Sequence, residues 1–185
     1  MSTEPQLWYF AYGANLDRET LIERRGIVPT EATCAVLRGY ELTFDQPGIP
    51  LMEPSFANLR PRANAEVHGV AYRLTASQLA ALDVLEGGGA YDHLDVQVEV
   101  SEGRALAAKT YATRDTQDGL FPSKRYLALL VRGARQHGLP DVWIARLEDQ
   151  RTGDVPGSAW IAPAVMRGFE LLFRARSVLR RWTQR

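Results

Sequence analysis

Cysteine and histidine are scarce in this chain. Among 185 residues there is one cysteine, Cys34, and there are three histidines. A single cysteine excludes an internal disulfide, so we expect a reducing, cytoplasmic location. His68, His93 and His137 lie far apart, and no pair has the spacing of metal ligands on a helix. The sequence therefore predicts no metal site. Cys34 lies in a strand-like run, where a buried, unreactive thiol is expected.

Long apolar runs and an excess of charge of one sign are also missing. No apolar stretch approaches the length of a membrane span, and the short polar N-terminus predicts no signal peptide. Lys and Arg number 22 and Asp and Glu number 22, which gives no global case for nucleic-acid binding. No serine shows a nucleophile-elbow pattern, so nothing favours covalent catalysis. The apolar fraction, 45%, is ordinary for a globular protein with a real core.

The pattern of the chain predicts one domain, 1–153, followed by an extension, 154–185. We expect strands and helices in the following order: strand 7–12, helix 16–25 ended by Gly26, strand 33–44 broken at Gly39, loop 45–62, strand 65–74, a helix after Thr75, strands 95–100 and 105–112, a helix starting at Pro122-Ser123, and helix 142–147. This order indicates an α+β fold, with a mixed sheet or small β-barrel and flanking helices.

The run Tyr9-Phe10-Ala11-Tyr12-Gly13-Ala14-Asn15-Leu16 is the most informative stretch. A strand-like aromatic segment ends in a Gly-small-Asn turn, and helix-forming residues follow at once. Such a turn can aim several backbone N–H groups at one small anion, and the start of a helix adds partial positive charge. Gly13 permits a positive φ and close approach, and Asn15 can cap the helix. The plain alternative is a well-capped connection between strand and helix.

Glu86 closes the helix that a capping box, Thr75 to Gln78, is expected to open. Leu79 and Leu82 mark the apolar face, and residue 86 lies close to that face because seven residues make nearly two turns. Burial and the negative end of the helix should both raise the pKa of Glu86, which suits a base near neutral pH. The alternative is a glutamate that frays into solvent beside Gly87.

Tyr126 lies on the helix after Ser123, on a face that it shares with apolar residues. We therefore expect it to point inward, with its hydroxyl bonded to a partner. Backbone and substrate are both open as that partner.

Several segments together resemble the γ-glutamylcyclotransferase-like (AIG2-like) family. They run in order from about Leu7 to Leu147 and comprise Tyr9–Leu16, His68–Leu74, Leu82–Gly87 followed by Tyr91, Pro122–Tyr126 and His137–Pro140. The resemblance implies the family's fold, with Glu86 as the catalytic residue. It also implies a substrate-binding set made of Tyr9, Phe10, Ala11, Tyr12, Gly13, Ala14, Asn15 and Tyr126.

Two departures from the family pattern stand out. Ala14 takes the place of the family's usual loop serine, so a hydroxyl contact is lost while the backbone donors remain. Gly87-Gly88-Gly89 is more flexible than the family pattern requires.

The resemblance implies that the α-amine of a γ-glutamyl compound attacks its own γ-carbonyl. This attack would release 5-oxoproline and a free amine or amino acid, with Glu86 as general acid and base and no cofactor. A γ-glutamyl amino acid is the first choice of substrate. A γ-glutamylamine, a protein crosslink remnant and a protected biosynthetic intermediate remain open. The alternative from another class is a non-catalytic protein of the same fold that binds a small acid or regulates a partner.

The extension 154–185 has the pattern of a basic amphipathic helix. From Arg167 onward there are six arginines against one acid, Glu170. Apolar residues recur at helical spacing at Val165, Phe169, Leu172, Phe173, Leu179 and Trp182. A helix packed on its own sheet, a homodimer contact and a peripheral membrane contact are all open.

Overall fold

The computed structural model describes residues 4–49, 53–85 and 91–153. Glu86 and the extension 154–185 lie outside the described residues. Within these ranges the elements, in chain order, are β1 (Gln6–Ala11), η1 (Ala14–Leu16), η2 (Glu19–Arg24), β2 (Glu31–Ile49), β3 (Glu53–Thr75), α1 (Ala76–Leu85), β4 (Asp92–Glu99), η3 (Ser101–Gly103), β5 (Ala105–Ala112), α2 (Lys124–Gln136) and α3 (Asp141–Glu148).

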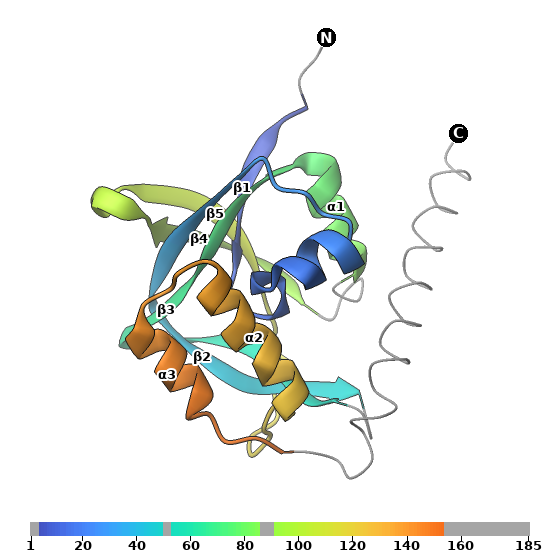
Figure 1. The fold of residues 1–185 in the computed structure, drawn as a ribbon, viewed down its shortest axis with the longest axis vertical. Helices are drawn as coiled ribbons and strands as arrows, with labels where there is room; N and C mark the ends of the chain where they lie inside the picture. The colour runs from blue at the N-terminus through green and yellow to red at the C-terminus, as the bar shows by residue number, and fades with distance from the viewer. Residues whose placement is uncertain (1–3, 50–52, 86–90, 154–185) are drawn as a thin grey trace, which may run out of the picture.

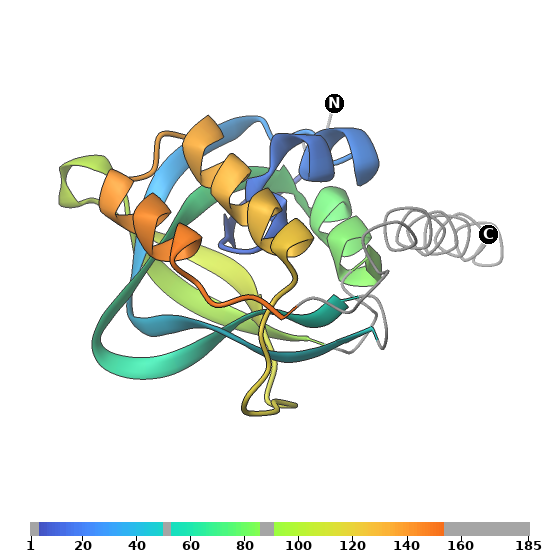
Figure 2. The same ribbon diagram turned by 60° about the horizontal axis from the view of Figure 1, so that its bottom comes forward.

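The five strands form a closed barrel in the order β1-β3-β2-β4-β5. Strand β1 is antiparallel to β3 along its whole length and parallel to β5, where Trp8 lies opposite Ala108. The barrel is therefore a mixed sheet, and the predicted α+β class with flanking helices is confirmed. In Figure 2 the helices gather together on one side of the barrel, with α2 between α3 and η2.

The predicted loop 45–62 is wrong. Residues 31–49 and 53–75 form two long antiparallel strands, β2 and β3. The prolines that suggested a loop occupy tolerant positions, because Pro61 pairs with Tyr40 beside the irregularity at Gly39, where φ is 79°. A second irregularity follows Thr43. These breaks in register let two strands much longer than usual curve around the barrel.

The predicted helix 16–25 is only partly right. A single 3₁₀ turn, η1, comes first, and a wide π-type turn, η2, begins at Glu19. The wide turn is visible in the hydrogen bond from the Arg25 N–H to the Thr20 carbonyl, 3.0 Å, which spans five residues. Gly26, with φ of 71°, ends it as predicted.

Helix α2 crosses the turn η1 at very close range (Figure 1). A Cβ atom on Gly133 would lie 2.4 Å from the carbonyl carbon of Leu16 and 2.6 Å from the nitrogen of Asp17. Both Gly133 and Leu16 are buried. Glycine is therefore needed at residue 133 so that the helix can touch the backbone that follows β1.

Gly133→Ala should destabilise the protein by about 1–3 kcal/mol, because the added methyl group overpacks the contact with Leu16. Alanine has the higher helix propensity by about 1 kcal/mol, so propensity alone predicts the opposite sign. Urea unfolding measures the change. Ala128→Gly, at an exposed position on the same helix, is the control and should show the ordinary cost of glycine in a helix. A more stable Gly133→Ala protein would contradict the close contact.

Candidate functional site

The turn after β1 presents backbone donors. The Leu16 N–H donates to the Gly13 carbonyl at 2.9 Å, and the Asp17 N–H donates to the Ala14 carbonyl at 3.1 Å. In the described part of the chain, no hydrogen bond uses the N–H groups of Gly13 and Ala14. Two adjacent amide donors at the end of a strand can therefore serve a small anion.

Gly13 lies close to its neighbours and does not adopt a positive φ. Its φ is −109°, so the positive φ that the sequence suggested does not occur. A Cβ atom at this residue would lie 3.3 Å from the hydroxyl oxygen of Tyr126 and 3.5 Å from the Cβ of Ala57. The turn thus lies directly against α2 and β3, and a larger side chain would displace one of them.

The residues of β1 that precede the turn are part of the core. Tyr9, Phe10, Ala11 and Tyr12 are all buried. The Asn15 side-chain amide donates to the Tyr9 hydroxyl at 2.7 Å. The sequence suggested that Asn15 caps the following helix. Its side chain bonds to Tyr9 instead.

Tyr126 meets this turn from α2. The helix starts at Ser123, as predicted, and Ser123 caps it, because its hydroxyl accepts the Tyr126 N–H at 3.0 Å. The Tyr126 hydroxyl accepts the backbone N–H of Ala57 at 3.2 Å, and its ring packs edge-on against Phe56. The structure therefore brings two of the three predicted site segments together, the turn after β1 and Tyr126.

Helix α1 begins with the predicted capping box. The Thr75 N–H donates to Gln78 at 2.9 Å, and the Gln78 N–H donates to the Thr75 hydroxyl at 3.2 Å. Leu79 and Leu82 are buried, as expected of the apolar face. The described helix ends at Leu85, so the place of Glu86 on this face stays a prediction.

The last turn of α1 is linked to the turn after β1. The Tyr111 hydroxyl on β5 donates to Asp83 at 2.5 Å, and His93 pairs with the same carboxylate oxygen at 2.9 Å. The Tyr111 carbonyl in turn accepts the Tyr12 hydroxyl at 2.6 Å. Tyr111 thus connects Asp83, three residues before position 86, with the start of the turn.

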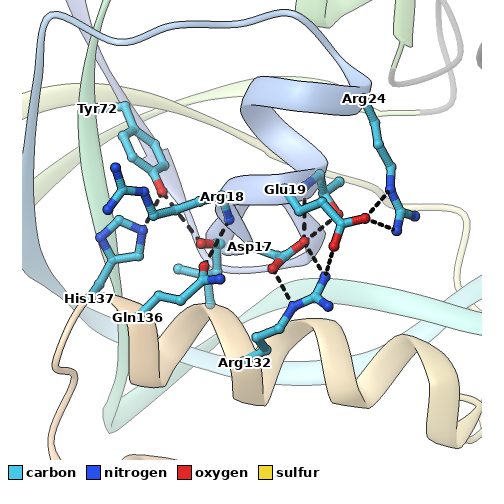
Figure 3. Close-up of polar contacts among 10 residues, drawn as sticks. Asp17, Arg18, Glu19, Arg24, Tyr72, Arg132, Gln136 and His137 are labelled. Carbon is cyan, nitrogen blue, oxygen red and sulfur yellow. Dashed lines mark hydrogen bonds and ion pairs between the residues drawn. The ribbon is translucent and has the colours of Figure 1, made fainter.

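Asp17 fixes the turn to α2 (Figure 3). Its carboxylate is fully buried and accepts the Thr20 N–H at 2.9 Å and two bonds from the Arg132 guanidinium at 2.7 and 2.8 Å. Burial by itself would raise the pKa of Asp17, but the hydrogen bonds from Arg132 and Thr20 outweigh it and hold the pKa below its usual value. Arg132 also contacts Glu19, which pairs with Arg24.

A second set of contacts ties the same turn to the end of α2 (Figure 3). The Arg18 N–H donates to the Gln136 side chain at 2.9 Å, and the Tyr72 hydroxyl lies 2.9 Å from Nε2 of His137. Burial raises the pKa of Tyr72 and lowers the pKa of His137, so both are neutral near pH 7. Together with Arg132 and Gly133, the Gln136 contact holds the backbone around Asp17 against the second half of α2, and the Tyr72–His137 contact joins the end of this helix to β3.

Cys34 corrects one expectation. Its thiol is exposed and not buried, and it donates to the His137 carbonyl at 3.1 Å.

Three carboxylates around the site were not singled out from the sequence. They are Asp17, Asp83 and Glu53, the last of which is fully buried at the start of β3. Asp17 and Thr20 have the spacing of a helix cap, so a local signal existed for Asp17. Asp83 bonds to Tyr111, 28 positions away, and Glu53 bonds to Ser123, 70 positions away, so no local pattern predicts their roles.

Within residues 4–49, 53–85 and 91–153, no group of three or more His, Cys, Asp and Glu side chains is arranged to hold a metal ion. None of the helices in these ranges combines the length and the apolar character needed to cross a membrane.

Comparison with known proteins gives a consistent result. Residues 66–147 match the AIG2-like family. The γ-glutamyl cyclotransferase gliK of Aspergillus fumigatus is 34% identical over 157 residues, and the match covers 71% of this chain and 57% of that protein. The γ-glutamyl cyclotransferase gliK of Claviceps purpurea is 33% identical over 156 residues, covering 78% of this chain and 70% of that protein. The chain belongs to the γ-glutamylcyclotransferase family. A solved γ-glutamyl cyclotransferase structure has a TM-score of 0.74 at 25% identity, covering 89% of this chain and 99% of the other.

Membership of the γ-glutamylcyclotransferase family accounts for the barrel and its flanking helices. The matched range 66–147 includes the segment that carries Glu86 and the helix that carries Tyr126. The turn after β1 lies before this range, but contacts with Tyr126 and Tyr111 connect it to residues inside the range.

Asp17→Asn tests how the turn is held. The folded-state pKa of Asp17 lies below its ordinary value of 3.8, so its stabilising charge is fully present above about pH 4 and is lost as the pH falls through the folded-state pKa. The variant should lose about 1–3 kcal/mol of unfolding free energy at pH 7, the size expected for hydrogen bonds to a charged group. The difference from the parent protein should shrink as the pH falls below about 4.

Urea unfolding at steps from neutral to acidic pH measures this difference. Asp95→Asn is the control, because Asp95 is an exposed partner of Lys109 and its loss should change stability little. Equal stabilities of the parent and Asp17→Asn proteins at pH 7 would contradict the role of Asp17.

Proposed function

We propose that this chain is a γ-glutamyl cyclotransferase that converts a small γ-glutamyl compound into 5-oxoproline and a free amine or amino acid. The named relatives support this activity. The observation that carries it in this chain is the meeting of the turn after β1 with Tyr126 at Gly13, beside the linked end of α1.

The reaction needs no nucleophile from the protein. The α-amine of the substrate attacks its own γ-carbonyl, a ring C–N bond forms, and the original γ-amide C–N bond breaks. Glu86 takes one proton from the α-ammonium group and passes it to the leaving nitrogen. The second proton, which the attacking nitrogen loses as it becomes the ring amide, also ends on the released amine, so no proton is lost or gained overall. Holding the substrate in its folded shape supplies a large part of the rate gain.

The place of Glu86 is supported by the link through Tyr111. Position 86 follows Asp83 by three residues, a distance of at most about 10 Å along the chain. Asp83 bonds to Tyr111, and Tyr111 accepts the Tyr12 hydroxyl. This link supports the proposal that a base at position 86 acts on a substrate held at the turn.

The turn would hold the charged end of the substrate. The N–H groups of Gly13 and Ala14 are suitable donors for its carboxylate or for the oxyanion that develops on the γ-carbonyl. Tyr126, which lies against Gly13, would contact the substrate. This arrangement uses backbone groups, so the replacement of the family's serine by Ala14 does not remove it.

The group beyond the γ-bond defines the exact substrate. We favour a γ-glutamyl amino acid, and γ-glutamylamines, crosslink remnants and protected intermediates are the alternatives to test. The extension 154–185 remains a proposed accessory to assembly or location, as a homodimer or peripheral membrane contact, and cytoplasmic location remains a prediction. No cofactor enters the proposed reaction.

The function is tested by incubating the purified full chain with one compound of each of these classes and measuring 5-oxoproline. We expect turnover of at least one. No 5-oxoproline from any of them would contradict the proposal.

Glu86→Gln keeps the size of the side chain but removes the base. Turnover of the accepted substrate should fall at least about a hundredfold, the low end of what a general base contributes, while the substrate still binds. Initial rates and substrate titration measure the two effects. Glu23→Gln, a change at an exposed glutamate on η2, should leave both unchanged. Near-normal turnover of Glu86→Gln would rule out Glu86 as the base.

Gly13→Val and Ala14→Ser separate backbone binding from side-chain binding. A valine at residue 13 would press on Tyr126 and Ala57, so substrate affinity should fall steeply. A serine at residue 14 keeps the backbone donors, so its affinity should change little. Substrate titration of the two variants measures this contrast, and a large loss for Ala14→Ser with none for Gly13→Val would reverse the assignment.

A further inference from the structure

The carboxylate of Glu53 is fully buried at the N-terminus of α2. It accepts the Ser123 N–H at 2.9 Å, the Ser123 hydroxyl at 2.6 Å and an N–H of Arg125 at 2.8 Å. Ser123 is the cap residue of α2, and the Arg125 donor is its guanidinium. The protein therefore bonds the cap of this helix to a glutamate of its own.

Glu53 is a costly way to stabilise a helix. Burial raises the pKa of its carboxyl, although the bonds from Ser123 and Arg125 offset part of the effect. Apolar residues that fill the same space often give equal or greater stability than a buried ion pair. What a buried carboxylate adds is directional bonding, which fixes the place of the groups that donate to it.

Tyr126 is the residue whose place these bonds fix. Glu53 accepts from the Ser123 hydroxyl, and the same hydroxyl oxygen accepts the Tyr126 N–H at 3.0 Å. Four residues along β3, the Ala57 N–H donates to the Tyr126 hydroxyl at 3.2 Å. Both ends of Tyr126 are thus bonded to β3, one through Ser123 and one directly, with the hydroxyl held next to Gly13.

We propose that Glu53 is a positioning residue that, through Ser123, holds the Tyr126 hydroxyl against the turn at Gly13, where substrate binds. This inference rests on the proposed function and adds a residue outside the predicted site.

A double-mutant cycle tests the proposal with four full-length proteins: the parent, Glu53→Gln, Tyr126→Phe and the double variant. Each single variant should raise KM for the accepted γ-glutamyl substrate about tenfold, the effect of one lost hydrogen bond. If Glu53 acts through Tyr126, the KM of the double variant should be no higher than the higher KM of the two single variants. Effects that multiply in the double variant would overturn the proposal, since they would show that Glu53 acts independently of Tyr126.

Ser123→Ala supplies a second route to the same answer. It removes the hydroxyl that joins Glu53 to the Tyr126 N–H and leaves the ion pair between Glu53 and Arg125 in place. It should raise KM like Glu53→Gln and should also show no further loss when combined with Tyr126→Phe. An unchanged KM in a folded Ser123→Ala protein would overturn the proposal.

Hydrogen exchange at the Ala57 amide gives a readout that needs no turnover. Tyr126→Phe removes the acceptor of this amide, so its exchange should quicken. Glu53→Gln and Ser123→Ala should quicken it as well, while amides in α3 keep their protection. An unchanged exchange rate of the Ala57 amide in Glu53→Gln and in Ser123→Ala would overturn the proposal. Because exchange is measured without substrate, a protein that turns over no γ-glutamyl compound would refute the proposed function and leave this test of Glu53 intact.

Discussion

Strand β1 is the element on which the rest of the structure depends. It closes the barrel by pairing with β3 on one edge and with β5 on the other. Its pairing with β5 brings Tyr111 close to the turn that follows, where the Tyr111 carbonyl accepts the Tyr12 hydroxyl. Ala57, the neighbour of Gly13, comes from the half of β3 that pairs with β2, so the site also depends on the long β2–β3 hairpin.

Two buried carboxylates fix the position of α2 in a way that apolar packing alone does not. Asp17 and Glu53 both lie under α2, and neither side chain is exposed to solvent. Their pKa values move in opposite directions, because Arg132 and Thr20 more than offset burial at Asp17, whereas burial prevails at Glu53. An apolar contact such as that of Gly133 sets how close the helix lies, and the two carboxylates set its position along the barrel.

The sequence predicted the features that depend on neighbouring residues. The capping box at Thr75 and the start of α2 at Ser123 lie where the local pattern placed them. The same local reasoning failed between residues 45 and 62, because prolines that break an ordinary strand are tolerated beside an irregular register. Glu53 lies in the middle of that misassigned stretch, and its partner Ser123 is 70 positions away, so no local pattern could identify it. The turn at Gly13 was found, but the reason for its glycine was a close contact that only the folded chain shows.

Helix α2 is attached to the barrel by contacts between residues that are far apart in the chain. Glu53 and Ser123 are separated by 70 residues, and Asp17 and Arg132 by 115. Its local partner is α3, which follows after a short connection. Contacts of this kind form late in folding, because loop closure must come first. The α2–α3 pair is therefore expected to dock last and to open first as a unit, so the residues that meet at Gly13 would separate before the barrel itself unfolds.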